Sequence, residues 1–361
     1  FEKQNGSAKA NLAAKFRKAG IDEKSADAGV FWVRRIFMDW KDEFLRLYLS
    51  GEVEDHRQAL ELKEKNLPQK LYRFRPGNNM NFVRDEILGL IYIPFIGGLN
   101  DPFDSSSLML SSSLSDYFDS IEYKKAFEKI WGKELPEEVF SKENWFEQLI
   151  EHFLKMTDCS DGEKKATRDA IRSTAEKQLI ELNQYFNYTL QTALRVASFS
   201  EKLTNLPMWS HYANEHKGIC FEYDISKIVD PYIKNRLFPV KYAPSLPNAI
   251  ALMEERMAEH KQPSFTLYDY FAMSKLDDWA YEKEWRLIIN LGLEMVKQED
   301  AEGKLAGQGM LHWFEKPSKI YFGAKIPEAQ KATIKELCKN HNIEMRQMKC
   351  TEYGLKDFPM E

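Results

Sequence analysis

Apolar and polar positions follow two different periods along the chain. Between about residues 24 and 66 the apolar residues recur every three or four positions, as in FWVRRIFMDWKDEFLRLYL. This spacing places them on one face of a helix and predicts two N-terminal helices. Pro68 ends the pattern, because the residue before a proline is disfavoured in a helix. We therefore expect an N-terminal helical segment over residues 1–67 and a second domain over 68–361.

Strand-like alternation dominates the second domain, and helical stretches interrupt it. Residues 115–193 are charged, aromatic and helical in pattern, which predicts a helical insertion, and further helices are expected around 247–260 and 264–276. Because strands and helices do not alternate regularly, the pattern indicates an α+β fold with a mixed sheet. The predicted strands are KLYRFRP (70–76), LIYIPF, LRVASFS (194–200), GICFEYDI, EWRLIINL, LHWFE, KIYFG and IEMRQM.

A short helix beginning at Pro207, in LPMWSHYANEHKG, gathers polar and aromatic side chains. Helical spacing puts Trp209 and Tyr212 on one face, and we expect Trp209 to pack in the core. His216 is expected at the end of this helix, where a positive imidazolium interacts favourably with the helix dipole. His211 and Tyr212 follow a predicted strand closely and can form one wall of a small-molecule pocket.

Composition and charge narrow the class of protein. Hydrophobic residues make up 43% of the 361 residues, enough for a sizeable core. The sequence has no apolar stretch of about 18 residues and no secretory signal, so we expect a cytoplasmic protein without membrane contact. Four separated cysteines, Cys159, Cys220, Cys338 and Cys350, favour free thiols. A formal charge of −5 argues against a uniformly nucleic-acid-binding surface but leaves room for a local basic groove.

Charged side chains near the start of one predicted strand are candidates for chemistry. In YEKEWR, strand alternation puts Glu282, Glu284 and Arg286 on one face. One interpretation is an exposed edge strand with an internal ion pair. The other is a pair of catalytic carboxylates facing a cleft, where they stabilise positive charge developing at an anomeric carbon.

Two other strands carry candidate binding residues. Arg73 and Arg75 share a face of LYRFRP, and the planar guanidinium suits a phosphate group, although an exposed strand arginine is an equal alternative. Ser198 and Ser200 share a face of ASFS, where serines are also common without any function.

The order of these three features resembles the arginine–serine–glutamate pattern of ADP-ribosyltransferases. The resemblance implies a split, mixed sheet and NAD as a substrate, with a small-molecule nucleotide in the cleft and a macromolecular or nucleotide acceptor. It implies the following roles: Arg73 for the NAD phosphate or ribose; Ser198 and Ser200 for the nicotinamide pocket; Glu284 for the ribosyl oxocarbenium ion; and Glu282 for activating the acceptor. Beside these residues we predict that Arg75, His211 and Tyr212 also contact the cofactor.

A second resemblance involves longer motifs. LYRFR, NDPF, MWSHYA and YEKEWR are similar to a widespread bacterial family of unknown function, over about residues 68–348. This resemblance implies that the N-terminal helices and residues 115–193 are additions to a shared domain. It implies little chemistry.

Three functions therefore remain under consideration. The first is ADP-ribosyl transfer or NAD hydrolysis, which association with similar families connects to bacterial toxins and phage defence. The second is a metal-dependent nuclease, although turn chemistry explains NDPFD without a metal and no metal ligand is assigned. The third is a ligand-sensing or partner-binding module that uses helices in 31–49 and 115–193. The nuclease would use Asp101, Asp104, Glu222 and Asp224.

Overall fold

The structure is a computed structural model that divides the chain into two compact units, Phe1–Asn66 and Leu67–Glu361. In the first unit, α3 (Trp40–Tyr48) packs against α4 (Val53–Lys65), and α3 buries apolar residues at helical spacing. The part of the predicted N-terminal helices before residue 39 lies outside the described residues. The structure describes residues 39–101, 104, 124, 128, 145–247, 252, 265–291 and 309–360.

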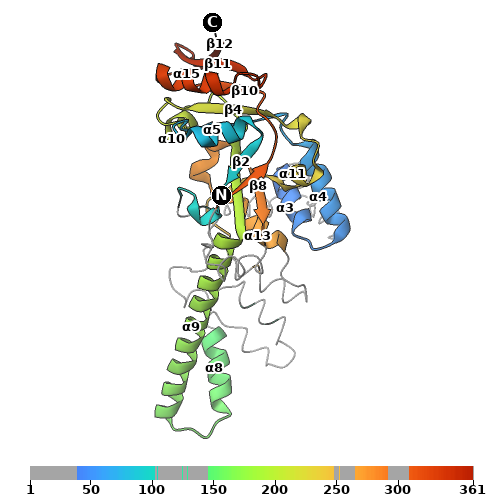
Figure 1. The fold of residues 1–361 in the computed structure, drawn as a ribbon. Coiled ribbons are helices and arrows are strands. Elements are labelled where there is room, and N and C mark those ends of the chain that lie inside the picture. The colour runs from blue at the N-terminus through green and yellow to red at the C-terminus, as the bar shows by residue number, and fades with distance from the viewer. Residues whose placement is uncertain are drawn as a thin grey trace, which may run out of the picture. The chain divides into compact units, whose positions relative to one another are not determined.

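An eight-stranded mixed sheet forms the centre of the second unit, in the spatial order β12-β11-β10-β4-β1-β3-β8-β5 (Figure 1). Neighbouring strands are antiparallel except for β10 and β11. The predicted α+β class with a mixed sheet is therefore confirmed. The strands are β1 (Lys70–Arg75), β3 (Leu194–Ser200), β4 (Ile219–Asp224), β5 (Leu237–Pro239), β8 (Glu284–Asn290), β10 (Lys319–Phe322), β11 (Glu344–Thr351) and β12 (Gly354–Pro359).

The sheet is nearly divided into two parts between β1 and β3, because these two strands pair at only one position. β1 pairs with β4 at six positions and β3 pairs with β8 at seven, whereas β1 meets β3 at one position, Tyr72 opposite Ser200. Beyond that position β3 bonds to the chain that follows β2 (Leu90–Ile93), since the Val196 amide donates to the Pro94 carbonyl oxygen at 2.9 Å. β1 and β3 therefore diverge beyond Tyr72 and Ser200.

The remaining elements surround the sheet. The predicted helix over 264–276 ends early, at Ala272, because the Lys241 amide donates to the Met273 carbonyl oxygen and the following residues pair as a strand. The helix predicted around 247–260 lies almost wholly outside the described residues. The short helices and strands around the sheet are α5 (Met80–Ile87), η1 (Ile96–Gly98), η3 (Ile225–Lys227), α11 (Pro231–Arg236), α13 (Phe265–Ala272), η4 (Asp277–Glu282), α15 (Glu328–Leu337) and the strand pairs β2 with β9 (Met310–Trp313) and β6 (Lys241–Ala243) with β7 (Ser274–Leu276).

Two helices occupy part of the predicted insertion. α8 (Trp145–Lys155) and α9 (Asp161–Ala193) lie side by side in Figure 1, and two arginines of α9 pair with two glutamates of α8. Between 105 and 144, only Lys124 and Glu128 belong to the described residues. None of the helices that the structure describes is both long and apolar enough to span a membrane.

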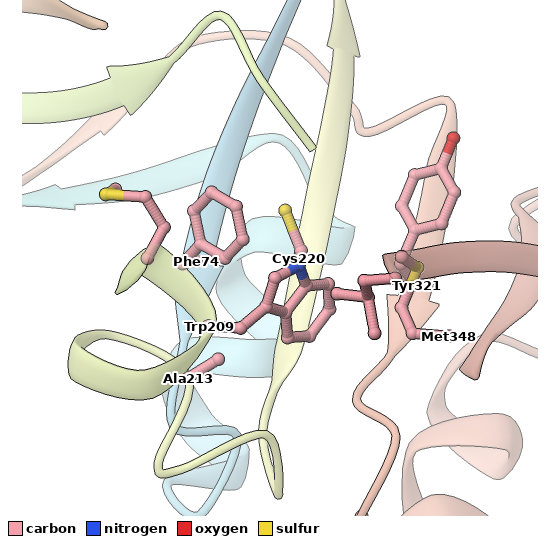
Figure 2. Close-up of a cluster of buried hydrophobic side chains, with 8 residues drawn as sticks. Phe74, Trp209, Ala213, Cys220, Tyr321 and Met348 are labelled. Carbon is pink, nitrogen blue, oxygen red and sulfur yellow. The ribbon is translucent and has the colours of Figure 1, made fainter. Parts of the chain in front are cut away.

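The short helix α10 (Leu206–His211) packs an aromatic cluster against the sheet. Trp209 is fully buried, and its ring meets Phe74 of β1 edge-on, with the centroids 5.2 Å apart. Figure 2 shows the indole beside Phe74 and Cys220. The prediction that Trp209 is a core residue is confirmed. All four cysteines are free thiols.

A left-handed turn follows α10. Residues 214–216 all have positive φ, and the Gly218 amide closes the turn on the Ala213 carbonyl oxygen at 2.7 Å. The prediction that His216 ends the helix is wrong, because α10 stops at His211 and the His216 ring stacks on Trp209 instead. After this turn the chain continues as β4, which pairs with β1.

Gly218 lies so close to β1 that it has no room for a side chain. A Cβ at this position would lie 2.2 Å from the Arg75 carbonyl oxygen. Because such a clash forces backbone to move, we expect Gly218→Ala to lower the free energy of unfolding by about 1–3 kcal/mol, measured by urea titration. Gly162 of α9, whose Cβ would meet nothing within 4 Å, is the control, and its alanine variant is expected to be at least as stable as the wild type. Equal stability of both variants would contradict this packing.

Candidate functional site

A cavity of about 430 Å³ lies where β1 and β3 diverge. This volume is within the range of about 300–1,000 Å³ that is typical of small-molecule sites. The cavity is lined by parts of β1, β3, α5, α10, the chain after β2 and the segment from β7 to β8. Its lining includes the predicted site residues Arg73, Arg75, Ser198, His211, Tyr212, Glu282 and Glu284.

Arg73 and Glu284 reach this cavity from opposite faces of the sheet. Glu284 pairs with Ser200, which pairs with Tyr72, so these three side chains share one face. Arg73 follows Tyr72 and lies on the other face, where its guanidinium carbon is 5.3 Å from the centre of the Phe199 ring. The two residues line one cavity because the strands between them separate.

The arginine end of the cavity is built around Glu86 of α5. The Arg75 Nε donates to Glu86 Oε1 at 2.6 Å, and the Arg73 Nε lies 3.3 Å from the same oxygen. Tyr223 donates its hydroxyl to Glu86 Oε2 at 2.9 Å. Two guanidinium groups therefore share one carboxylate among the described side chains, which gives this end a net positive charge.

Arg73 has binding capacity that the described residues leave unused. Its side chain is 4% exposed, and Nη2 donates to the Tyr92 carbonyl oxygen at 2.7 Å. Burial, together with the charge of Arg75, lowers the pKa of Arg73 to about 10, so it stays cationic at neutral pH. Arg73 Nη1 and Arg75 Nη2 are buried and have no hydrogen-bond partner among the described residues. A buried donor without a partner is costly, and an anionic ligand would remove that cost.

Two cations hold Glu284 at the other end of the cavity. Arg286 donates to both carboxylate oxygens, at 2.8 and 3.0 Å, and Lys275 Nζ lies 3.3 Å from Oε2. Burial alone would raise the pKa of Glu284. The charges of Arg286 and Lys275, with a hydrogen bond from Ser198, outweigh burial and hold this pKa well below its usual range. Glu284 is therefore ionised at neutral pH.

Asp104 completes the charge balance at this end. Both terminal nitrogens of Arg286 donate to Asp104, at 2.7 and 2.6 Å, and Lys275 lies 3.4 Å from it. Three carboxylates, those of Asp104, Glu282 and Glu284, thus face the two cations Lys275 and Arg286. With all three ionised this end has a net negative charge, which favours a ligand group that becomes positive.

Glu282 lies beside Glu284 and shares Lys275 with it. Lys275 Nζ and the Tyr212 hydroxyl each donate to Glu282 at 2.6 Å. The strand alternation predicted for Glu282 is wrong, because Lys283 has a left-handed φ of 49° and Glu282 ends η4 before β8 begins. The two carboxylates still face the same cavity, through the turn at Lys283.

Burial and the charge of Glu284 raise the pKa of Glu282 to about 7, against the opposing effects of Lys275 and Tyr212. The folded state therefore binds this proton more tightly than the unfolded state, and stability is expected to fall as pH rises from about 4.5 to about 7. Stability that depends on the low pKa of Glu284 is lost below that window. Urea titrations from pH 5 to pH 8 should show a shallower pH dependence for Glu282→Gln than for the wild type. Parallel curves would contradict the assignment.

Ser200, predicted to help shape the nicotinamide pocket, does not line the cavity. Its hydroxyl is buried, donates to the Glu282 carbonyl oxygen at 2.6 Å and accepts from the Lys202 amide at 3.2 Å. Ser200 therefore fixes the backbone of the turn that presents the two carboxylates. Ser198, two residues earlier, is exposed in the cavity.

Three of the four carboxylates of the nuclease alternative bond to other groups of the protein. Asp104 pairs with Arg286, Glu222 accepts from the Tyr321 hydroxyl at 2.6 Å, and Asp224 caps η3. No group of three or more metal-binding side chains occurs within the part of the chain that the structure describes.

Lys275 and Glu86 were not among the predicted site residues, although both organise the cavity. Lys275 falls in a segment with helical spacing, and Glu86 is one of many charges on α5, so neither stands out in the sequence. Lys275 could have been suspected only because it lies a few residues before Glu282 and Glu284 in the sequence. Glu86 can be recognised only once the contact between α5 and Arg75 of β1 is known.

The cavity and sheet define an α+β protein with a ligand-sized site at the division of its sheet. Residues 208–287 match the model of a family described as protein of unknown function (DUF2971). The matched range includes His211, Tyr212, Lys275 and both glutamates, and it supports a relationship to a family of unknown function. No curated protein and no solved structure matches the chain.

Proposed function

We propose that this protein transfers ADP-ribose from NAD to an acceptor, or to water when no other acceptor is bound. One observation carries the proposal: Arg73 and Glu284 line a single cavity that is net positive at its arginine end and holds an ionised carboxylate at the other end. The pyrophosphate of NAD is anionic, and the anomeric carbon of its nicotinamide ribose becomes positive as the glycosidic bond breaks. A cavity with this polarity complements both parts of the molecule.

In this reaction the bond between the ribose carbon and the nicotinamide nitrogen breaks, and its electron pair leaves with nicotinamide. Glu284, held ionised by Arg286 and Lys275, stabilises the positive charge on the ribosyl group. An acceptor hydroxyl, amine or water then bonds to the ribose carbon and gives its proton to Glu282. The raised pKa of Glu282 suits this role, because a base works best when its pKa is near the working pH.

Ser198, His211 and Tyr212 contribute to the remaining wall of the cavity. Ser198 is exposed there, and its hydroxyl oxygen, whose proton is donated to Glu284, can accept a hydrogen bond from the nicotinamide amide or a ribose hydroxyl. Tyr212 donates to Glu282 and keeps that carboxylate turned toward the cavity. His211 is exposed at the wall, with its ring 6.5 Å from that of Tyr281.

The proposal is tested by binding and turnover of NAD. We expect NAD and ADP-ribose to raise the unfolding temperature, because a ligand that binds only the folded state stabilises it. We also expect chromatography to detect nicotinamide released from NAD. If neither ligand changes the unfolding temperature at millimolar concentration and no nicotinamide is released, the proposal is wrong.

A further inference from the structure

Two aromatic rings lie stacked at the arginine end of the cavity. Phe82 of α5 and Tyr92 of β2 both line it, with ring centroids 5.2 Å apart and planes 27° apart. Phe82 remains 40% exposed, whereas the aliphatic Val83 and Ile87 of the same helix are buried. An aromatic side chain left open at a cavity offers a surface on which a planar ring can stack.

The aromatic pair is close to Arg75, whose guanidinium group has one nitrogen without a hydrogen-bond partner among the described residues. Phe82 and Glu86 are four residues apart and so lie on the same side of α5, and Glu86 bonds Arg75 at 2.6 Å. Arg75 is 26% exposed, and its Nη2 has no hydrogen-bond partner among the residues described here. A flat apolar surface beside a cationic fork fits a nucleotide base with its phosphate.

The register of the sheet places the Phe82–Tyr92 pair and Arg75 away from Glu282 and Glu284. Glu284 lies opposite Ser200 on the neighbouring strand, and Ser200 lies opposite Tyr72 of β1. Arg75 is three residues further along β1 from Tyr72, or about 10 Å at roughly 3.3 Å per residue. A single ligand can therefore contact both Glu284 and Arg75 only if it is long enough to place one group at each end of the cavity.

We propose that Phe82 and Tyr92 bind the adenine ring of NAD and that Arg75 binds the adjacent phosphate. This inference rests on the proposed function and gives the substrate a direction, with the adenylate half at α5 and the nicotinamide ribose at Glu284. The site then selects a dinucleotide over nicotinamide mononucleotide, which lacks the adenylate half.

The test compares NAD, nicotinamide mononucleotide and AMP by isothermal titration on the wild type and on Phe82→Ala, Phe82→Trp and Leu88→Ala. Leu88 is an exposed apolar residue at the end of α5 outside the cavity lining, and it serves as the control. We expect Phe82→Ala to weaken NAD and AMP binding about 10- to 100-fold and to change mononucleotide binding less than about twofold. Leu88→Ala is expected to bind NAD like the wild type, and Phe82→Trp, which keeps an aromatic face, is expected to bind NAD more tightly than Phe82→Ala.

The outcomes separate this inference from the proposed function. If Phe82→Ala weakens NAD and the mononucleotide equally, or weakens neither, the adenine site is wrong while NAD turnover still stands. If the wild type binds neither NAD nor ADP-ribose, the proposed function is wrong. In that case AMP binding that requires Phe82 would still support an adenylate site, and absence of AMP binding would overturn it.

Discussion

Replacing Glu284 with glutamine is expected to lower NAD turnover about 100- to 1,000-fold, because a preorganised group that stabilises transition-state charge commonly contributes that much. Glutamine keeps the size of the side chain and loses its negative charge. Arg286 and Lys275 then face the site without that charge, which opposes a positive ribosyl group. NAD binding itself is expected to change much less, since in the ground state the positive charge lies on the nicotinamide ring and reaches the ribosyl group only as the bond breaks. Nicotinamide release measures the first quantity and isothermal titration the second.

Asp269→Asn is the matched control for Glu284→Gln. Asp269 is a buried carboxylate that pairs with Arg236 at 2.7 and 2.8 Å, and Arg236 also donates to the carbonyl oxygen of Ile288 in β8. Neither partner lines the cavity. The Asp269→Asn variant disturbs a comparable ion pair, between α13 and α11, that contacts the same strand, and it should keep full turnover at temperatures where it is folded. Equal turnover in Glu284→Gln and Asp269→Asn would rule out a catalytic role for Glu284.

Replacing Arg286 with methionine is expected to cost about 3–5 kcal/mol of unfolding free energy, the range for removing one partner of a buried ion pair. Arg286 is fully buried and donates to both Asp104 and Glu284. Without it, two buried carboxylates lose the guanidinium that bonds both of them, although Lys275 still lies beside each. Urea titration measures the loss.

A double variant separates the charge effect from packing. Adding Asp104→Asn to Arg286→Met removes one of the two carboxylates that have lost the Arg286 charge, so part of the lost stability is expected to return. If Arg286→Met costs less than about 1 kcal/mol, or if the second substitution adds its own full cost, the buried network does not hold β8 in place.

The local structure of the sheet could be predicted well from the sequence. The alternation in LYRFR, LRVASFS and EWRLIIN defines β1, β3 and β8 to within a residue, because period-two patterning over a half-buried strand is a strong signal. β12, the edge strand beside β11, was not predicted. β5, β6 and β7 also escaped prediction, since each is three residues long and forms through pairing with a distant segment. Pairing of that kind leaves little trace in local composition.

The cavity itself follows from tertiary register and could not be derived from local pattern. Alternation alone places Arg73 on one face of a strand, and nothing in it says that β1 leaves β3 after Tyr72. The order of the arginine, serine and glutamate motifs nevertheless led to Arg73, Ser198 and Glu284, which line the same cavity. Ser200 was grouped with Ser198 by the same alternation, although its hydroxyl is engaged by the backbone of Glu282.

A crystal structure of Glu284→Gln soaked with NAD would test the central claim most directly. We expect the anomeric carbon of the nicotinamide ribose beside residue 284 and the pyrophosphate on Arg73, within the cavity between β1 and β3. NAD bound elsewhere on the protein, or a cavity that stays empty at saturating NAD, would contradict the claim that these two residues form one substrate site.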